Sequence, residues 1–288
     1  MIGAELDAPV DLDRYPIHDE ATAEALAGPL ARAFASRGVA ELPGLVPPQT
    51  VGRMVAECEA IAGTGHHSEV TNSVYLDRPD PALGDGDPGS VAVRSSLRAV
   101  AADCIPTHHA LRRLYEWPPL RAFVGRILGV ERLHPYADPL GALNVAEMGP
   151  GDELGWHFDQ SDFVTSLSIR PAGDGGEFEV VAGLRRPDDE RPDEVRAVLD
   201  GDTDRVERLP FEPGTLLVFA GRHSLHRVTP VRVGPSRLVG LLAFDTRPDT
   251  DSSDRLKLVR YGRTGPRDTG PPATTGRTSR GQEGDGAA

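Results

Sequence analysis

Two kinds of residue are scarce in this chain, cysteine and the aromatic residues. Among its 288 residues are only two cysteines, Cys58 and Cys104, too few for a disulfide framework or a thiolate zinc cluster. So few cysteines also indicate a reducing, cytoplasmic location. Aromatic residues make up 5%, whereas there are 32 glycines and 26 prolines. This composition favours short strands joined by many turns over a helical bundle.

Long apolar runs and an excess of positive charge are also missing. No segment approaches the roughly 20 apolar residues that cross a bilayer, and no early stretch resembles a secretion signal, so we expect no membrane partner. The formal net charge of −13 disfavours attraction to phosphate backbones. Nucleic acid is therefore not an expected partner. The apolar content of 39% is still sufficient for a full core.

Composition divides the chain into a body and a tail. Residues 264–288 contain no large aliphatic and no aromatic side chain, so they cannot bury enough surface to offset their ordering entropy. We predict a disordered tail there and one domain over residues 1–263. Within that domain, residues 64–92 are polar and rich in glycine and proline, and their length exceeds that of an ordinary connection. This segment is a candidate lid loop.

The hydrophobic period changes near the middle of the chain. Helical spacing predicts helices over 21–36, 49–61, 106–115 and 120–128, with a short strand at 39–42. After about residue 132 the period becomes two. Six apolar segments follow, separated by turn residues: LGALNVAEM, DFVTSLSIR, GEFEVVAGL, GTLLVFAG, HRVTPVRV and SRLVGLLAFD. The pattern predicts a mainly β, α+β protein, a sandwich or barrel with the amino-terminal helices packed outside.

One charged segment interrupts the predicted strands. Residues 185–210 carry many acidic and basic side chains, and we interpret them as a solvated insertion.

The segment GWHFDQSDF contains a candidate metal-binding pair. His157 and Asp159 are separated by one residue, so on an extended chain both side chains emerge on the same face. A second signal lies in HSLHRVTPVRVGPSR, where His226 begins a strand and Arg237 follows after a turn. His223 is the alternative histidine in this segment, and its place before the strand favours it less.

Two imidazoles and one carboxylate form the facial triad that suits non-haem Fe(II). The triad leaves three neighbouring coordination positions for a bidentate acid and O2. The charges of Fe(II), Asp159, a bound 2-oxoglutarate and Arg237 sum to zero, which matters because an unpaired dianion in a partly dry barrel would be costly. The planar fork of Arg237 also matches the distal carboxylate of this cosubstrate. We therefore expect Arg237 to anchor 2-oxoglutarate.

The segments WHFD, GGEFEVV, SLHRVTPV and SRLVGLLAFDTRP resemble the Fe(II)/2-oxoglutarate-dependent oxygenases. The resemblance covers roughly residues 130–262 and is closest to the free-amino-acid (lysine-type) halogenases and their hydroxylase relatives. It implies a double-stranded β-helix, or jelly roll, with the iron between its two sheets. It also implies catalytic roles for His157, Asp159 and His226, and a small amino-acid-like substrate in natural-product biosynthesis.

One position departs from the halogenase members of that family. They carry a small residue, usually glycine, where Asp159 stands, and the vacated position accepts chloride. A carboxylate here implies hydroxylation of an aliphatic C–H bond, or desaturation or ring closure through the same substrate radical. Halogenation is disfavoured.

Four further residues are candidates for binding cosubstrate or substrate. By the resemblance, Arg94 matches an arginine that holds a substrate carboxylate, although a surface loop arginine is an equal interpretation. Asn144 could hydrogen-bond cosubstrate or substrate, and it could equally be a buried amide satisfied by backbone groups. His134 and Gln160 have the same ambiguity as possible substrate-binding residues.

Two other functions remain open from the sequence. A non-catalytic jelly-roll module could bind a ligand and use its histidines only structurally. A hydrolytic zinc site could use the same two histidines and aspartate. The second alternative leaves Arg237 without a role, and no glutamate base is tied to the motif.

Overall fold

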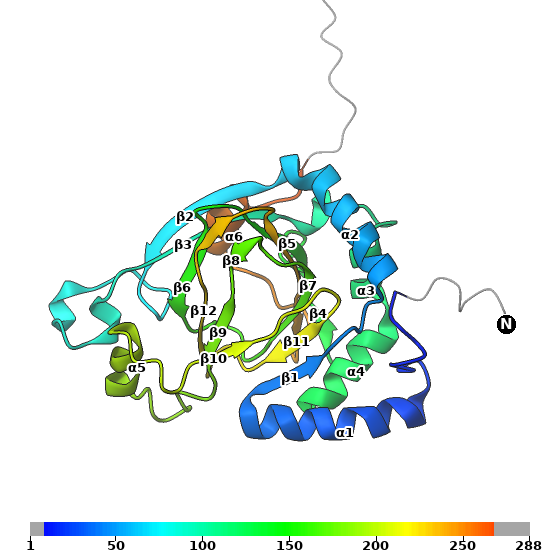
Figure 1. The fold of residues 1–288 in the computed structure, drawn as a ribbon, viewed down its shortest axis with the longest axis horizontal. Coiled ribbons are helices and arrows are strands. Elements are labelled where there is room, and N and C mark those ends of the chain that lie inside the picture. Colours follow the sequence, from blue (N-terminus) through cyan, green and yellow to red (C-terminus); the bar gives the residue numbers. More distant parts are fainter. Residues whose placement is uncertain (1–8, 268–288) are drawn as a thin grey trace, which may run out of the picture.

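One antiparallel sheet curls into a half-barrel at the centre of the molecule (Figure 1). The structure is a computed structural model that describes residues 9–267. The strand order is β1-β11-β7-β14-β5-β3-β6-β12-β9-β10, and β2 pairs with β3 outside this path. Two small two-stranded sheets, β13-β8 and β15-β4, complete the strands of the described chain.

The strands are short, as the period-two segments predict. Their bounds are β1 Val39–Leu42, β2 His66–Asn72, β3 Val93–Val100, β4 His134–Pro135, β5 Leu143–Met148, β6 Glu153–His157, β7 Val164–Arg170, β8 Asp174–Gly175, β9 Phe178–Val181, β10 Glu207–Leu209, β11 Leu216–Phe219, β12 Leu225–Val228, β13 Val231–Val233, β14 Arg237–Leu242 and β15 Phe244–Asp245.

Four helices from the first half of the chain cover the convex side of the sheet (Figure 1). The helices of the described residues are α1 Glu20–Arg37, α2 Pro48–Ile61, α3 Ala110–Glu116, α4 Pro118–Leu128, α5 Pro192–Leu199 and α6 Asp254–Tyr261. The first four agree with the predicted helices to within a few residues. Helix α1 shows why: the Asp19 side chain accepts a hydrogen bond from Thr22 N at its start, and Gly38 ends it in the left-handed conformation.

Alternating side chains divide the sheet between two apolar cores. On β11, Leu216 and Val218 pack with the helices, whereas Leu217 and Phe219 belong to a second cluster on the other, concave side. Strand β5 shows the same alternation, and its Met148 side chain belongs to the second cluster. The inside of the half-barrel is therefore lined in part by apolar side chains, and the polar residues among them stand out.

Two strands, β2 and β3, were not predicted from the pattern. All seven residues of β2 pair with β3, although Val70 is the only large aliphatic residue in β2. Exposed and half-buried side chains alternate along it, as suits an edge strand with one face toward solvent. The predicted lid loop 64–92 thus begins with a strand, and only residues 73–92 form an irregular excursion with two short 3₁₀ turns.

The irregular excursion and the charged insertion pack against each other. Helix α5 lies in the insertion, and Arg196 of α5 donates a hydrogen bond to the Asp85 carbonyl oxygen. A third apolar cluster, which contains Val74, Phe158 and Val195, joins both segments to the sheet. Figure 1 shows α5 beside the loop that precedes β3. The insertion is therefore more structured than its charge pattern indicates.

The end of the described chain lies against the sheet. Helix α6 contacts β2, and Arg263 pairs with Asp103 at 2.6 Å. Arg267 N also donates to Asp103 Oδ2 at 2.8 Å, so the first residues of the predicted tail are held. The remainder of that tail, residues 268–288, lies outside the described residues.

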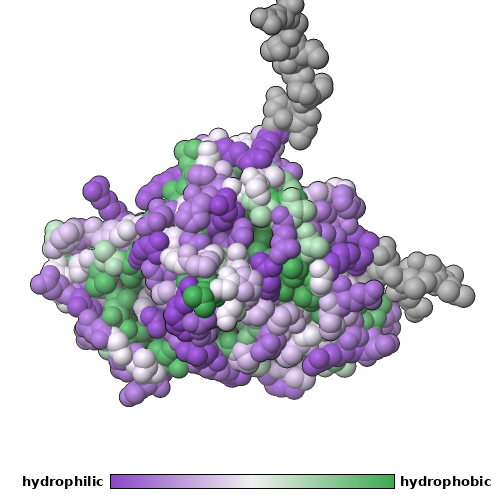
Figure 2. Space-filling model, turned by 45° about the horizontal axis from the view of Figure 1, so that its top comes forward, coloured by the Kyte–Doolittle hydropathy of each residue, from purple (hydrophilic) through white to green (hydrophobic). Residues whose placement is uncertain are grey.

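The molecular face in Figure 2 is mainly hydrophilic, with apolar residues in small separate groups. Among residues 9–267, none of the helices combines the length and apolar character needed to cross a membrane.

Candidate active site

His157 and Asp159 leave the end of β6 on the same side of the chain. His157 is the last residue of β6. Backbone hydrogen bonds hold the next two residues: Phe158 N donates to Val74 O, and Asp159 N donates to Gly221 O. Phe158 points the other way and is 1% exposed in the third apolar cluster. The period-two spacing of the pair therefore has the expected effect.

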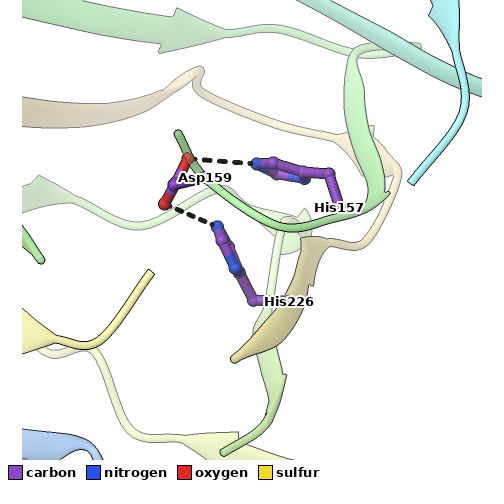
Figure 3. A group of neighbouring side chains, drawn as sticks. All are labelled: His157, Asp159 and His226. Carbon is purple, nitrogen blue, oxygen red and sulfur yellow. Dashed lines mark ion pairs between the residues drawn. The ribbon is translucent and has the colours of Figure 1, made fainter. Parts of the chain in front are cut away.

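His226 joins this pair from the neighbouring strand β12. It stands directly opposite His157 in the β12-β6 ladder, which places both imidazoles on one face of the sheet. Figure 3 shows both rings pointing at the Asp159 carboxylate. One ligand atom from each of the three residues lies within 4.8 Å of the other two. His223 is not part of this group.

The orientation of both imidazoles is fixed by backbone carbonyl groups. His157 Nδ1 lies 2.7 Å from Gly155 O, and His226 Nδ1 lies 2.9 Å from Ser224 O. A carbonyl oxygen only accepts, so each Nδ1 carries the proton and donates. The Nε2 atoms then face Asp159, at 3.8 Å for His157 and 3.2 Å for His226. This arrangement is typical of metal-binding histidines, whose second nitrogen is held by an outer partner.

Burial and mutual charge set the protonation of the group. Burial, together with repulsion from His226, lowers the pKa of His157 to about 4. Burial alone would raise the pKa of Asp159, but attraction and a hydrogen bond from His226 outweigh it and bring the pKa to about 2. Burial also opposes protonation of His226, yet Asp159 raises its pKa above the usual value. At neutral pH the group therefore offers a carboxylate and a neutral His157.

Gly221 gives the Asp159 side chain its space. A Cβ atom on Gly221 would lie 2.4 Å from Asp159 Oδ2 and 2.9 Å from Asp159 Cβ, far inside van der Waals contact. The Gly221 carbonyl oxygen also accepts the Asp159 amide at 3.1 Å. A larger residue at this position would occupy the space from which the carboxylate faces both imidazoles.

A cavity of about 590 Å³ opens on the Asp159 side of the group. Its lining comes from the loop 73–92, from the charged insertion and from the segments around the ligand pair. The lining residues are Tyr75, Asp77, Asp87, Phe158, Asp159, Gln160, Arg185, Glu190, Pro192 and Arg222. A molecule in this cavity would reach Asp159 directly.

A second cavity of about 310 Å³ contains Arg237. Phe178 lines this cavity and also packs on His226, with ring centroids 5.7 Å apart. Arg237, at the start of β14, is 6% exposed, and burial lowers its pKa to about 10. Within the described residues its polar contact is Met148 Sδ at 4.0 Å, with the Phe211 ring 5.6 Å away, and it has no acidic partner. A buried cation without an anion is costly, so this cavity is suited to an anionic ligand.

The other predicted residues have different surroundings. Gln160 lines the first cavity. Asn144 on β5 is 5% exposed, and its Oδ1 has no hydrogen-bond partner within residues 9–267. A polar ligand could satisfy this atom, although Asn144 lines neither cavity.

Arg94 is held by Glu69 and Glu153 and lines neither cavity. His134 lies on β4 opposite Asp245, also outside both linings. The structure brings neither Arg94 nor His134 to the group.

The sequence did not single out several residues of the site, among them Gly221, Phe158 and Arg185. Gly221 appears as one glycine among many, Phe158 as a spacer within the ligand pair, and Arg185 as part of a charged run. Only for Phe158 was there a signal, because an apolar residue between two polar ones on an extended segment faces the opposite side.

Comparison with known proteins supports the fold. The SnoK carbocyclase from nogalamycin biosynthesis, a non-haem α-ketoglutarate-dependent protein, aligns with a TM-score of 0.56 at 14% identity over 85% of this chain and 96% of SnoK. AviO1 from Streptomyces viridochromogenes Tue57 gives 0.53 at 20% identity over 79% and 96%. The SnoN epimerase gives 0.51 at 16% identity over 77% and 83%, and it has been crystallised with Fe3+, α-ketoglutarate and nogalamycin RO. No curated protein sequence matches the chain.

The curled antiparallel sheet is the jelly-roll fold that these iron- and α-ketoglutarate-dependent proteins share, and in this chain it carries a His-Asp-His group. A family model matches residues 22–257, and by this match the chain belongs to the halogenase D family. The predicted jelly roll is confirmed, and the cofactors of these neighbours agree with the predicted cofactor class.

Proposed function

We propose that His157, Asp159 and His226 hold Fe(II), and that Arg237 binds the distal carboxylate of 2-oxoglutarate. The donor set supports the first assignment, because two imidazole nitrogens and one carboxylate suit this metal. The unpaired, buried guanidinium of Arg237 supports the second. We also propose Asn144 as a polar contact for the cosubstrate or substrate: its orphaned Oδ1 accepts from a donor group on the substrate, whereas only its NH2 group can donate to 2-oxoglutarate.

When bound, the iron and 2-oxoglutarate supply oxidation of a C–H bond by O2, with release of succinate and CO2. The chain's own residues hold the reactants. The cavity at Asp159 receives the substrate, and its walls exclude bulk water from the reacting centre. Phe158, packed behind the ligand pair, keeps His157 and Asp159 on one side.

The substrate in this proposal is a small, amino-acid-like metabolite, oxidised in the cytoplasm as a step of natural-product biosynthesis. The product is an alcohol, or an alkene or ring formed through the same radical. Asp159 favours these products over a halogenated one, because its carboxylate lies 3.2 Å from His226 Nε2 and fills the third ligand position. Acidic and basic side chains together line the cavity, as suits a zwitterion.

Product analysis tests the reaction type. The protein is incubated with Fe(II), 2-oxoglutarate, a panel of free amino acids and excess chloride, and succinate and organic products are measured by mass spectrometry. We expect amino-acid-stimulated succinate release and an oxygenated or dehydrogenated product, with no chlorinated one. A chlorinated main product would refute the role of Asp159. Absence of a visible charge-transfer band with Fe(II) and 2-oxoglutarate under anaerobic conditions would refute the oxygenase site.

Replacing Gly221 with alanine tests the packing around Asp159. The new Cβ would displace the carboxylate, so we expect Fe(II) affinity to fall about 10- to 100-fold, the range seen when a residue that orients a ligand is lost. Anaerobic Fe(II) titration measures it. Gly52→Ala in α2 is the matched control, because nothing lies within 4 Å of its added Cβ. Equal iron affinity in the two variants would contradict the positioning role of Gly221.

A further inference from the structure

Arg185 lies in the wall of the substrate cavity, held in a fixed orientation. Its side chain is 15% exposed, and its guanidinium stacks over the Phe158 ring at 4.5 Å and near the Tyr75 ring at 5.9 Å. These cation–π contacts fix the plane of the fork beside the residue that separates the two metal ligands.

Part of this guanidinium is available to a ligand. Its Nε donates to the Arg222 carbonyl oxygen at 2.6 Å, and Nη1 donates to Glu190 Oε2 at 3.0 Å. Nη2 donates to no residue in the described part of the chain. Glu190 is 57% exposed, so its ion pair is screened by solvent and costs little to exchange. A ligand carboxylate that displaced Glu190 would receive two parallel hydrogen bonds from Nη1 and Nη2.

The other arginines near the cavity are more exposed and pair with acidic residues. Arg222 at the rim donates from Nε to Asp162 at 2.5 Å and from Nη2 to the Gln160 carbonyl oxygen, and it is 43% exposed. Arg94 bonds Glu69 and Glu153 outside the cavity. Arg185 and Arg222 each keep one Nη group without a partner in the described residues, so it is the burial of Arg185 and its stacking on Phe158 that suit it to recognition of a carboxylate.

Acidic residues line the same cavity on the loop before β3. Asp77 and Asp87 come from this loop, whereas Arg185 is the first residue of the charged insertion, which follows β9. The cavity thus places carboxylates and one oriented guanidinium around a common space. That pattern is complementary to a molecule with both an amine and a carboxylate.

We propose that Arg185 binds the carboxylate of the substrate in a bidentate manner, in exchange for Glu190, and so selects free acids over neutral analogues. This assignment rests on the proposed oxygenase function. It replaces Arg94, which the resemblance implies for that role.

A comparison of matched acids and amides tests the assignment. Succinate release is measured with each free L-amino acid of a panel and with its primary carboxamide, for the unaltered protein and for Arg185→Gln. We expect the unaltered protein to prefer the free acid by about 30-fold or more in kcat/KM, the effect of losing one partner of a buried charge pair. In Arg185→Gln the preference should fall to about threefold or less, and in Arg185→Lys it should be intermediate, because lysine keeps the charge without the fork.

Two control variants separate the possible outcomes. Arg94→Gln should keep the full acid preference, and Glu190→Gln should lower KM for the acid, because it removes the competing carboxylate. An unchanged preference in Arg185→Gln, or a lost preference in Arg94→Gln, would overturn the assignment. So would a panel in which no free acid stimulates turnover. The anaerobic Fe(II)/2-oxoglutarate band, recorded on the same samples, shows separately whether the oxygenase function survives.

Discussion

Replacing Asp159 with alanine is expected to abolish turnover and to weaken Fe(II) binding by about 100-fold or more. Asp159 supplies the only carboxylate of the three-residue group, and two imidazoles alone are a poorer ligand set for this metal. The loss should exceed the 10- to 100-fold effects of residues that merely orient a ligand. Anaerobic Fe(II) titration and succinate release measure the two effects.

Asp162→Ala is the matched control for this variant. Asp162 is a nearby carboxylate that is 74% exposed and pairs with Arg222 outside the group. Its removal should leave iron affinity within about threefold of the unaltered protein, because exposed ion pairs contribute little. If Asp159→Ala bound Fe(II) as tightly as Asp162→Ala, the three residues would not share a metal ion.

Replacing Arg237 with glutamine is expected to raise KM for 2-oxoglutarate by about 30-fold or more, since the cosubstrate would lose a buried charged partner. The same variant should be at least as stable as the unaltered protein when no cosubstrate is present. The reason is that Arg237 is a buried cation without an acidic partner in the described chain, and burying such a charge is unfavourable. Succinate release against 2-oxoglutarate concentration and thermal unfolding measure the two effects.

In Arg237→Gln we expect weaker binding of 2-oxoglutarate together with unchanged or higher stability, and this combination makes the test specific. A structural arginine would lose stability on substitution, whereas a ligand-binding arginine loses affinity. Addition of 2-oxoglutarate with a divalent metal should raise the unfolding temperature of the unaltered protein and much less that of Arg237→Gln. Arg232→Gln is the control, because Arg232 is 58% exposed and pairs with Asp174 outside the cavity. An unchanged KM in Arg237→Gln would show that another residue holds the cosubstrate.

The metal group was predictable because local geometry determines most of it. His157 and Asp159 lie two residues apart on an extended segment, which fixes their common side. His226 is the second residue of β12, and its position opposite His157 depends on strand pairing that the sequence alone does not determine. Arg237 was identifiable by charge and spacing, yet its lack of a partner is visible only in the folded chain.

The rest of the site depends on contacts between distant segments. Arg185 lies within a charged run, and only the stacking on Phe158 distinguishes it from its neighbours. Gly221 matters because of an atom 62 positions earlier, so no local pattern marks it. Strand β2 is polar except for Val70 and is specified by pairing with β3 rather than by a buried face. Packing, not periodicity, determines these features.

The third apolar cluster has a consequence for how new specificities can arise in this scaffold. Val74 and Val195 anchor the two segments that frame the cavity at Asp159, and both pack in one cluster with Phe158, which lies between the proposed metal ligands His157 and Asp159. If these two segments were replaced by segments from another protein, the new segments would therefore need apolar side chains that pack against Phe158. Grafts chosen for their polar side chains alone would tilt the aromatic ring and misalign the ligands, so selectivity and reactivity have to be re-engineered as one unit.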